Sequence, residues 1–165
     1  MTVERVNDIV HSGPSDTDLT RTICIPINDD YSHVIHWAIT NSLNPVTDKV
    51  VLLHVREVEH AALAYPYFPA HESMLEMEEK LKSSSITLLK NAADDLLKHN
   101  IQCRAVSLRG DPREELEFKI NKLQPDFVIV ANKNSRSLKK LLMGSVSNYL
   151  LHHLNYPIVV VPADN

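Results

Sequence analysis

Short apolar runs alternate along the chain with stretches in which apolar residues recur at helical spacing. The runs are rich in β-branched residues, and most are nearly continuous in apolarity, as is typical of strands covered on both faces. They span residues 22–27, 50–55, 101–108, 127–130 and 157–162. Because a segment with helical periodicity follows each of the first four runs, the pattern predicts right-handed βαβ crossovers. The expected fold is α/β, a doubly wound five-stranded parallel sheet.

Two segments fall outside this alternation. Residues 1–21 mix Ser, Asp, Thr, Gly and Pro with few large apolar side chains, so we expect a flexible N-terminal arm followed by one domain over 22–165. Residues 57–72 contain Tyr65, Pro66, Tyr67 and Phe68, a composition that favours an aromatic flap over regular structure. A capping box, Ser73-x-x-Glu76, is expected to begin the helix that follows, and Asp111 and Pro112 are expected to be the N-cap and the first residue of a later helix that ends near residue 123.

Composition narrows the class of protein. The 165 residues fit one domain, and 17 basic against 21 acidic residues give a net charge of −4, which argues against a nucleic-acid partner. No apolar stretch approaches the length of a membrane span, and the first 21 residues lack a secretory core, so we expect no membrane contact and a cytoplasmic location. Cys24 and Cys103 lie in separate predicted strands and are expected to be small core residues.

The candidate chemistry lies where the strands end. In an open doubly wound sheet the ligand binds beyond the carboxyl ends of the strands, which here means residues 26–29, 54–55 and 131–134. Residues 144–147, Gly-Ser-Val-Ser, open the last predicted helix, where free amides, the helix dipole and two hydroxyls suit a phosphate. The alternative is that Ser145 is an ordinary N-cap.

These segments together resemble the universal stress protein family over residues 22–162. The resemblance rests on residues 128–147, which are similar to the family signature of two spaced glycines, a nine-residue gap and Gly-Ser, and on residues 52–55, 110–112 and 156–162. It implies a Rossmann-like sheet of order 3-2-1-4-5, as in adenine nucleotide alpha hydrolases. It also implies a homodimer through the fifth strands, at Ile158, Val159, Val160 and Val161.

In one branch of this family the resemblance implies an ATP or AMP site, with or without Mg²⁺. The sequence departs from that pattern at three positions, because Ala131 and Asn134 replace the signature glycines and Asn28 replaces the aspartate usual after the first strand. The expected nucleotide-binding residues are Pro26, Ile27, Asn28, Val55, Ala131, Asn134, Gly144, Ser145, Val146 and Ser147.

Three functions remain open. The first is a dimeric adenine-nucleotide-binding module of the stress response, read by a protein partner. The second is a slow nucleotide hydrolase, for which only Asp29, Asp30 and Asp111 could hold a metal. The third is a dimeric scaffold that binds no nucleotide. We assign no catalytic or metal-binding residue.

Other polar residues have simpler interpretations. His54 is expected to be a satisfied core histidine rather than a catalytic base, and His152-His153 to stabilise a helix end. A basic cluster, Lys133, Arg136, Lys139 and Lys140, is either a solvated loop or a means of steering anions.

Overall fold

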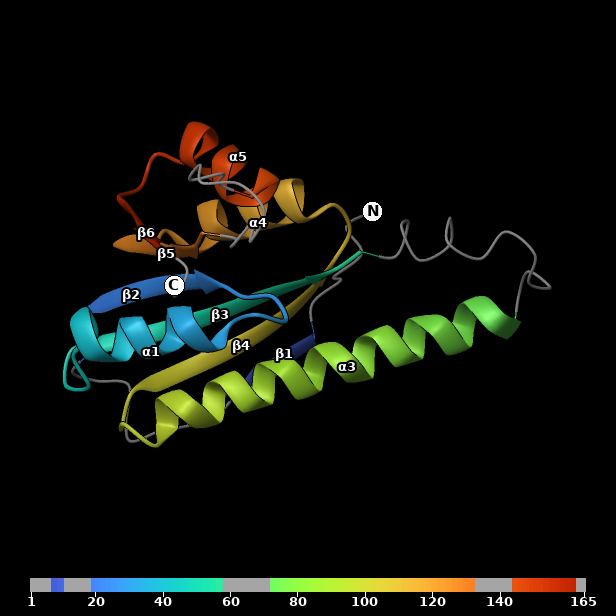
Figure 1. Ribbon diagram of the computed structural model, residues 1–165, viewed down its shortest axis with the longest axis horizontal. Helices are drawn as coiled ribbons and strands as arrows, with labels where there is room; N and C mark the ends of the chain where they lie inside the picture. Colours follow the sequence, from blue (N-terminus) through green and yellow to red (C-terminus); the bar gives the residue numbers. More distant parts are fainter. Residues whose placement is uncertain (1–6, 11–18, 58–71, 133–143, 163–165) are drawn as a thin grey trace.

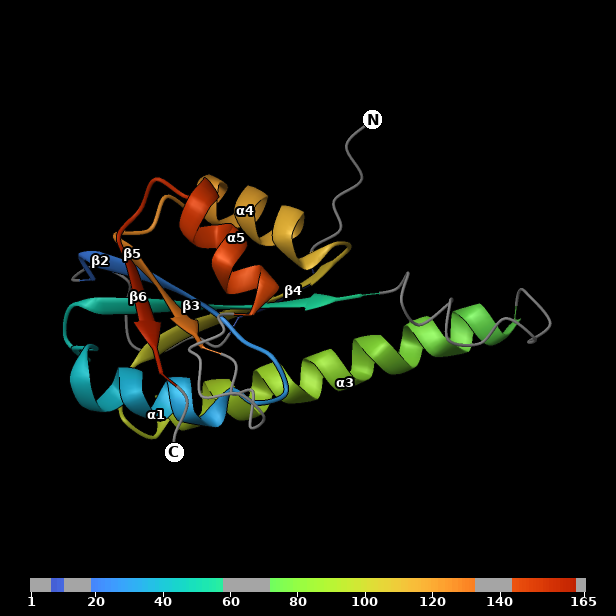
Figure 2. The same cartoon turned by 45° about the horizontal axis from the view of Figure 1, so that its top comes forward.

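The computed structural model describes residues 7–10, 19–57, 72–132 and 144–162. In these ranges a six-stranded sheet has the order β1-β4-β3-β2-β5-β6 (Figure 1). The strands are β1 Asn7–Val10, β2 Arg21–Pro26, β3 Asp48–Arg56, β4 Gln102–Arg109, β5 Phe127–Ala131 and β6 Ile158–Val161. The helices are α1 Ser32–Asn41, α3 Glu72–Leu97, α4 Pro112–Leu123 and α5 Ser145–His153. Helices α1 and α3 cover one face of the sheet, and α4 and α5 cover the other (Figure 2).

The five strands expected from the sequence are all parallel to one another. Counted from β2 to β6, they lie in the order third, second, first, fourth, fifth. The chain winds outward from β2 to β3 and β4 on one side, and then to β5 and β6 on the other. The predicted doubly wound α/β fold and its strand order are therefore confirmed, with the strand order reversing between β2 and β5.

Coverage on both faces explains the continuous apolarity of the strands. In β2, Ile23 and Ile25 pack beneath α1 and α3, whereas Cys24 packs beneath α4 and α5, and all three are fully buried. Since neither face meets water, neither alternate position needs a polar residue. Cys103 lies in the opposite core layer from Cys24, and both are free thiols. Burial raises the pKa of Cys24 to about 12 and that of Cys103 to about 11, so both are inert core residues as predicted.

The N-terminal arm is not wholly without regular structure, contrary to our expectation. Residues 7–10 form β1, which pairs antiparallel with β4 from Asn7 opposite Ser107 to Val10 opposite Arg104. Strand pairing satisfies backbone groups at the edge of β4 and does not require the apolar composition on which the expectation relied. The rest of the arm up to residue 18, apart from β1, lies outside the described residues.

Two helix starts test the capping predictions. Asp111 caps α4, because its side chain accepts hydrogen bonds from the amides of Arg113 and Glu114, and Pro112 follows as predicted. Gly110 has a φ of +144°, and a Cβ there would lie 2.9 Å from Glu115, so this turn requires glycine. The capping box at Ser73 is wrong, because α3 already includes Glu72 and Ser73 lies within the helix.

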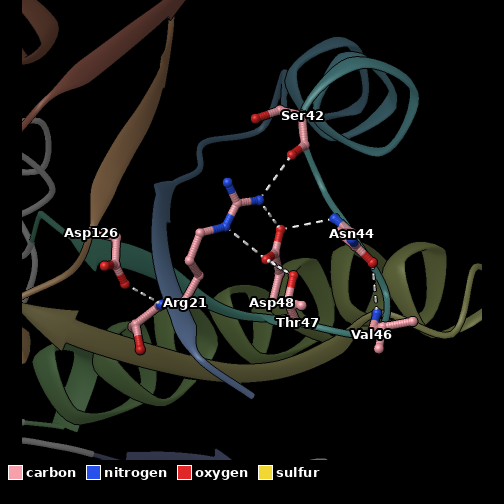
Figure 3. Close-up of polar contacts among 8 residues, drawn as sticks. Arg21, Ser42, Asn44, Val46, Thr47, Asp48 and Asp126 are labelled. Carbon is pink, nitrogen blue, oxygen red and sulfur yellow. Dashed lines mark hydrogen bonds and ion pairs between the residues drawn. The ribbon is translucent and has the colours of Figure 1, made fainter. Parts of the chain in front are cut away.

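The amino ends of β2 and β3 are joined by a cluster of polar groups around Asp48 (Figure 3). Asp48 is fully buried, and the Arg21 Nε donates to its Oδ1 at 2.8 Å. The amide of Asn44 and the hydroxyl of Thr47 also donate to this carboxylate. Burial alone would raise the pKa of Asp48, but these hydrogen bonds hold it below its ordinary value. This edge of the sheet is therefore closed by a satisfied ion pair.

Candidate functional site

A crevice of about 520 Å³ opens at the carboxyl ends of β2, β3 and β5 and at the start of α5. This is the position where strand order reverses and where doubly wound sheets bind ligands. Its volume is within the range of small-molecule sites. It brings together nine of the ten predicted site residues: Pro26, Ile27, Asn28, Val55, Ala131, Gly144, Ser145, Val146 and Ser147. The tenth, Asn134, lies outside the described residues, as do the four residues of the predicted basic cluster.

The first turn of α5 faces this crevice without a side-chain cap. Gly144 is the N-cap residue, and no side chain of the described residues caps the first amides of the helix. The N-cap interpretation of Ser145 is therefore wrong: Ser145 is the first helical residue, and it is exposed. Gly144 has an ordinary backbone (φ −59°, ψ 153°), so backbone strain does not explain this glycine. Free amides at the positive end of the helix dipole are suited to bind an anion.

Ser147 is less available to a ligand than the sequence suggested. Its hydroxyl donates to the carbonyl oxygen of Ala131 at 2.9 Å. This hydrogen bond ties the first turn of α5 to the end of β5. The hydroxyl proton is already used, so Ser147 positions the helix and can offer a ligand its amide and an oxygen lone pair.

Two polar side chains in the crevice wall have buried atoms without a hydrogen-bond partner among the described residues. Asn132 follows β5 and is only 7% exposed, and the atom concerned is its Oδ1. In His33, which lies in the first turn of α1, the atom is Nε2. Both residues line the crevice. A buried polar atom without a hydrogen-bond partner lowers the stability of the fold. A polar ligand in this crevice would supply the missing partner.

The sequence interpretation placed residues 131–134 at this edge but did not name Asn132 as a binding residue, and it missed His33. The available signal for Asn132 was its place directly after a buried strand at the ligand-binding edge. His33 lies in the first turn of a helix that starts just after β2, and only the fold shows that this turn reaches the crevice.

Asn28 lines the crevice, and its side-chain oxygen and side-chain nitrogen differ in hydrogen bonding. Its Oδ1 accepts a hydrogen bond from the amide of Asp30 at 3.1 Å. This leaves the Nδ2 amide, a donor, as the group available to a ligand. Asp29 and Asp30 also line the crevice, whereas Asp111 caps α4 and pairs with Arg113. No group of three or more acidic, histidine or cysteine side chains able to hold a metal occurs in the described ranges.

His54 is a satisfied histidine, as predicted, and it also reaches the crevice. Its Nδ1 lies 2.7 Å from the hydroxyl oxygen of Ser85, which lies 2.8 Å from that of Ser107. Burial lowers the pKa of His54, with Arg56 adding to this effect and Asp29 opposing it. The ring is therefore held neutral between β3, α3 and β4.

The apolar part of the crevice wall comes from three segments of the chain. Ile27 is almost fully buried, and Pro26, Val55 and Val146 are partly buried. The crevice therefore combines an apolar surface suited to a flat ring with an anion-binding helix start and a few unpartnered polar groups. No helix in the described part of the chain is long and apolar enough to cross a membrane.

The sequence profile of the universal stress protein family matches residues 20–162. Among curated relatives, a universal stress protein A-like protein of Arabidopsis thaliana is 23% identical over 115 residues, which cover 68% of this chain and 66% of that protein. Universal stress protein MJ0577 of Methanocaldococcus jannaschii is 26% identical over 128 residues, which cover 72% of this chain and 79% of the relative.

Solved structures share the fold. The structure of MJ0577 matches with a TM-score of 0.71 at 21% identity, covering 89% of this chain and 99% of that one. An Arabidopsis thaliana family member with AMP bound matches with a TM-score of 0.63 at 20% identity, covering 87% and 92%. A universal stress protein of Archaeoglobus fulgidus in complex with dAMP matches with a TM-score of 0.55 at 12% identity, covering 86% and 98%.

Proposed function

Because the chain belongs to the universal stress protein family, we propose that its crevice binds an adenine nucleotide, ATP or AMP. The observation that carries this proposal is the uncapped first turn of α5, which faces an apolar crevice of nucleotide size. Family members of the same fold have been solved with AMP and with dAMP. The protein acts as a binding module of the stress response, and a protein partner reads its occupancy.

The two ends of the nucleotide have different partners in this proposal. The phosphates accept hydrogen bonds from the amides of Ser145, Val146 and Ser147, where the helix dipole favours negative charge. The base lies against the apolar wall formed by Ile27 and Val55. Asp29 and Asp30, at the other side of the crevice, would repel the phosphates, which favours this orientation over the reverse.

We propose binding without catalysis. Phosphoryl transfer requires a metal held by carboxylates and a positioned water, and Asp29 and Asp30 are the only pair of adjacent carboxylates in the described crevice wall. When Mg²⁺ accompanies ATP, these two residues are the side chains here that could approach it. Release of less than one product per site over several hours, measured with labelled ATP, separates a binding module from a slow hydrolase.

The direct test is calorimetry with ATP and AMP, with and without Mg²⁺. We expect affinity in the micromolar range, about 8 kcal/mol at 1 µM. Gly144→Val places a branched side chain where the phosphates approach, and it should abolish binding without unfolding the protein. Asn155→Val, an exposed position just beyond the other end of α5, is the matched control and should bind normally. Equal affinity of Gly144→Val and wild type would refute the proposal, and absence of binding to wild type would favour the scaffold function.

We further propose that β6 forms a homodimer by antiparallel pairing with β6 of a second copy. The opposite edge of the sheet is covered by β1, whereas no described strand pairs with the outer side of β6. Ile158, Val159 and Val160 are partly exposed on this edge, and Pro157 and Pro162 limit the length of pairing.

Val160→Lys would bring like charges together near the two-fold axis and should give monomers by light scattering. Val46→Lys, on a residue that is 70% exposed away from β6, should leave the dimer intact. A monomeric wild type at tens of micromolar would contradict this assembly. We propose that this domain is located in the cytoplasm.

A further inference from the structure

Two arginines lie side by side at the carboxyl ends of β3 and β4. Arg56 and Arg109 are register partners in the parallel pairing of these strands. Both occupy the face that α3 covers, since they continue the alternation of His54 and Ser107, which contact Ser85 of α3. Glu78 of α3 lies beside them, with its Oε1 3.0 Å from Arg109 Nε.

Arg56 is buried, and its Nε has no hydrogen-bond partner among the described residues. The residue is 7% exposed. Burial lowers the pKa of Arg56, with Arg109 adding to this effect and Glu78 opposing it. A guanidinium remains charged even when buried, so it needs an anion or several acceptors to offset its lost hydration.

Within the described residues the charges in this cluster do not balance, because two guanidinium groups face one carboxylate. That carboxylate is engaged by Arg109. The cluster is open to solvent on one side, because the side chains of Arg109 and Glu78 are 38% and 37% exposed. A solvent anion can therefore reach the buried guanidinium past these two residues.

We propose that Arg56 and Arg109 form a second anion site, separate from the crevice at α5, that takes a phosphate group. Strands in a sheet lie about 4.8 Å apart, so two guanidinium groups from neighbouring strand ends can each offer paired N–H donors to one tetrahedral oxyanion. Planar paired donors of this kind match phosphate oxygens. The phosphate comes either from free inorganic phosphate or from a nucleotide, and Glu78 competes with it for Arg109. This site does not depend on nucleotide binding in the crevice.

Thermal unfolding and calorimetry with inorganic phosphate, at constant ionic strength set with chloride, test this site. Phosphate should raise the melting temperature of the wild type. Arg56→Met should weaken phosphate binding about tenfold or more, because it removes a charge-assisted donor pair. Arg109→Met, at a partly exposed position, provides the same measurement if the Arg56 variant does not fold. Glu78→Gln should tighten binding several-fold, since it removes the competing carboxylate.

Two control variants test whether the phosphate response belongs to these arginines. Lys98→Met removes one positive charge from the far end of α3, where Lys98 pairs with Asp95, and should respond to phosphate like wild type. Gly144→Val should also keep the phosphate response, although it loses nucleotide binding. Loss of the response in Gly144→Val with retention in Arg56→Met would overturn the proposal by locating the anion at α5. The proposal would also be overturned if phosphate did not raise the melting temperature of the wild type, or if Glu78→Gln left the affinity for phosphate unchanged.

AMP and ATP identify the source of the phosphate. If free phosphate is the ligand, Arg56→Met should bind both nucleotides with wild-type affinity. If the group belongs to a nucleotide, Arg56→Met should weaken ATP binding. An Arg56→Met variant that keeps wild-type affinity for phosphate and for both nucleotides would contradict both forms of the site.

Discussion

The amino ends and the carboxyl ends of the strands, called here the amino edge and the carboxyl edge of the sheet, differ in how fully their buried polar groups are hydrogen-bonded. At the amino edge, the carboxylate of Asp48 accepts hydrogen bonds from Arg21, Asn44 and Thr47, and the cluster needs nothing further (Figure 3). At the carboxyl edge, Asn132 and Arg56 are each 7% exposed, and each has a buried atom without a partner among the described residues. The same sheet therefore stabilises itself at one edge and leaves hydrogen-bonding capacity for ligands at the other.

This difference has a physical cause. An unpartnered buried polar group lowers stability unless something binds it. The amino edge joins β2 and β3 through neighbouring segments of the chain, which supply all the partners. At the carboxyl edge the crevice separates β2 from the start of α5, and no described residue fills the gap. We therefore expect the stability of the fold and the proposed binding of ligands to depend on separate ends of the same strands.

The largest expected effect comes from breaking the amino edge. Asp48→Ala removes the acceptor of several hydrogen bonds in a buried site, and it should lower the free energy of unfolding by about 3 kcal/mol, measured by urea denaturation. Nucleotide affinity of the folded fraction should not change. Asp126→Ala is a control at the same edge, because the exposed side chain of Asp126 accepts a hydrogen bond from the Thr22 amide. If Asp126→Ala lowers the free energy of unfolding as much as Asp48→Ala does, the buried cluster around Asp48 is not what stabilises this edge.

A smaller and opposite effect is expected at the carboxyl edge. Asn132→Leu replaces an unsatisfied buried amide with an apolar side chain of similar size. It should raise the free energy of unfolding by about 1 kcal/mol and weaken nucleotide binding about tenfold. If this variant is instead destabilised and binds normally, Asn132 serves the fold and the contrast between the edges fails.

The smallest expected effect is a difference in acid sensitivity between the two edges. The pKa of His54 is lowered in the folded protein by burial, so its stabilising contribution is complete above the unfolded value of about 6.5 and is lost as the pH falls below it. The pKa of Asp48 is also lowered, so its contribution is lost only below about pH 4.

Unfolding curves at several pH values check these windows. His54→Phe should remove part of the decline that begins near pH 6.5, and Asp48→Ala should remove part of the decline below pH 4. Superimposable pH profiles of wild type and both variants would contradict the assignment of these groups.

The sequence predicted the features that depend on repeated patterns. Buried strands are continuous in apolarity because helices cover both faces, and Asp111-Pro112 carries its own capping chemistry, so both were recognisable. Strand β1 was missed because backbone pairing leaves no signature in composition. Arg21 was assigned to the flexible arm because its partner Asp48 is 27 residues away. Asn132 and Arg56 look like ordinary polar residues after a strand, and only the packing of α3 and α5 shows that they are buried.

The carboxyl edge should bind the nucleotide, and the amino edge should not. Amide chemical shifts recorded by NMR during titration with AMP test this division most directly. The largest changes should occur at Ser145, Val146 and Asn132, while the amides of Arg21 and Asp48 stay constant. Shifts confined to the amino edge, or spread evenly over both edges, would contradict the division of roles between the two ends of the strands.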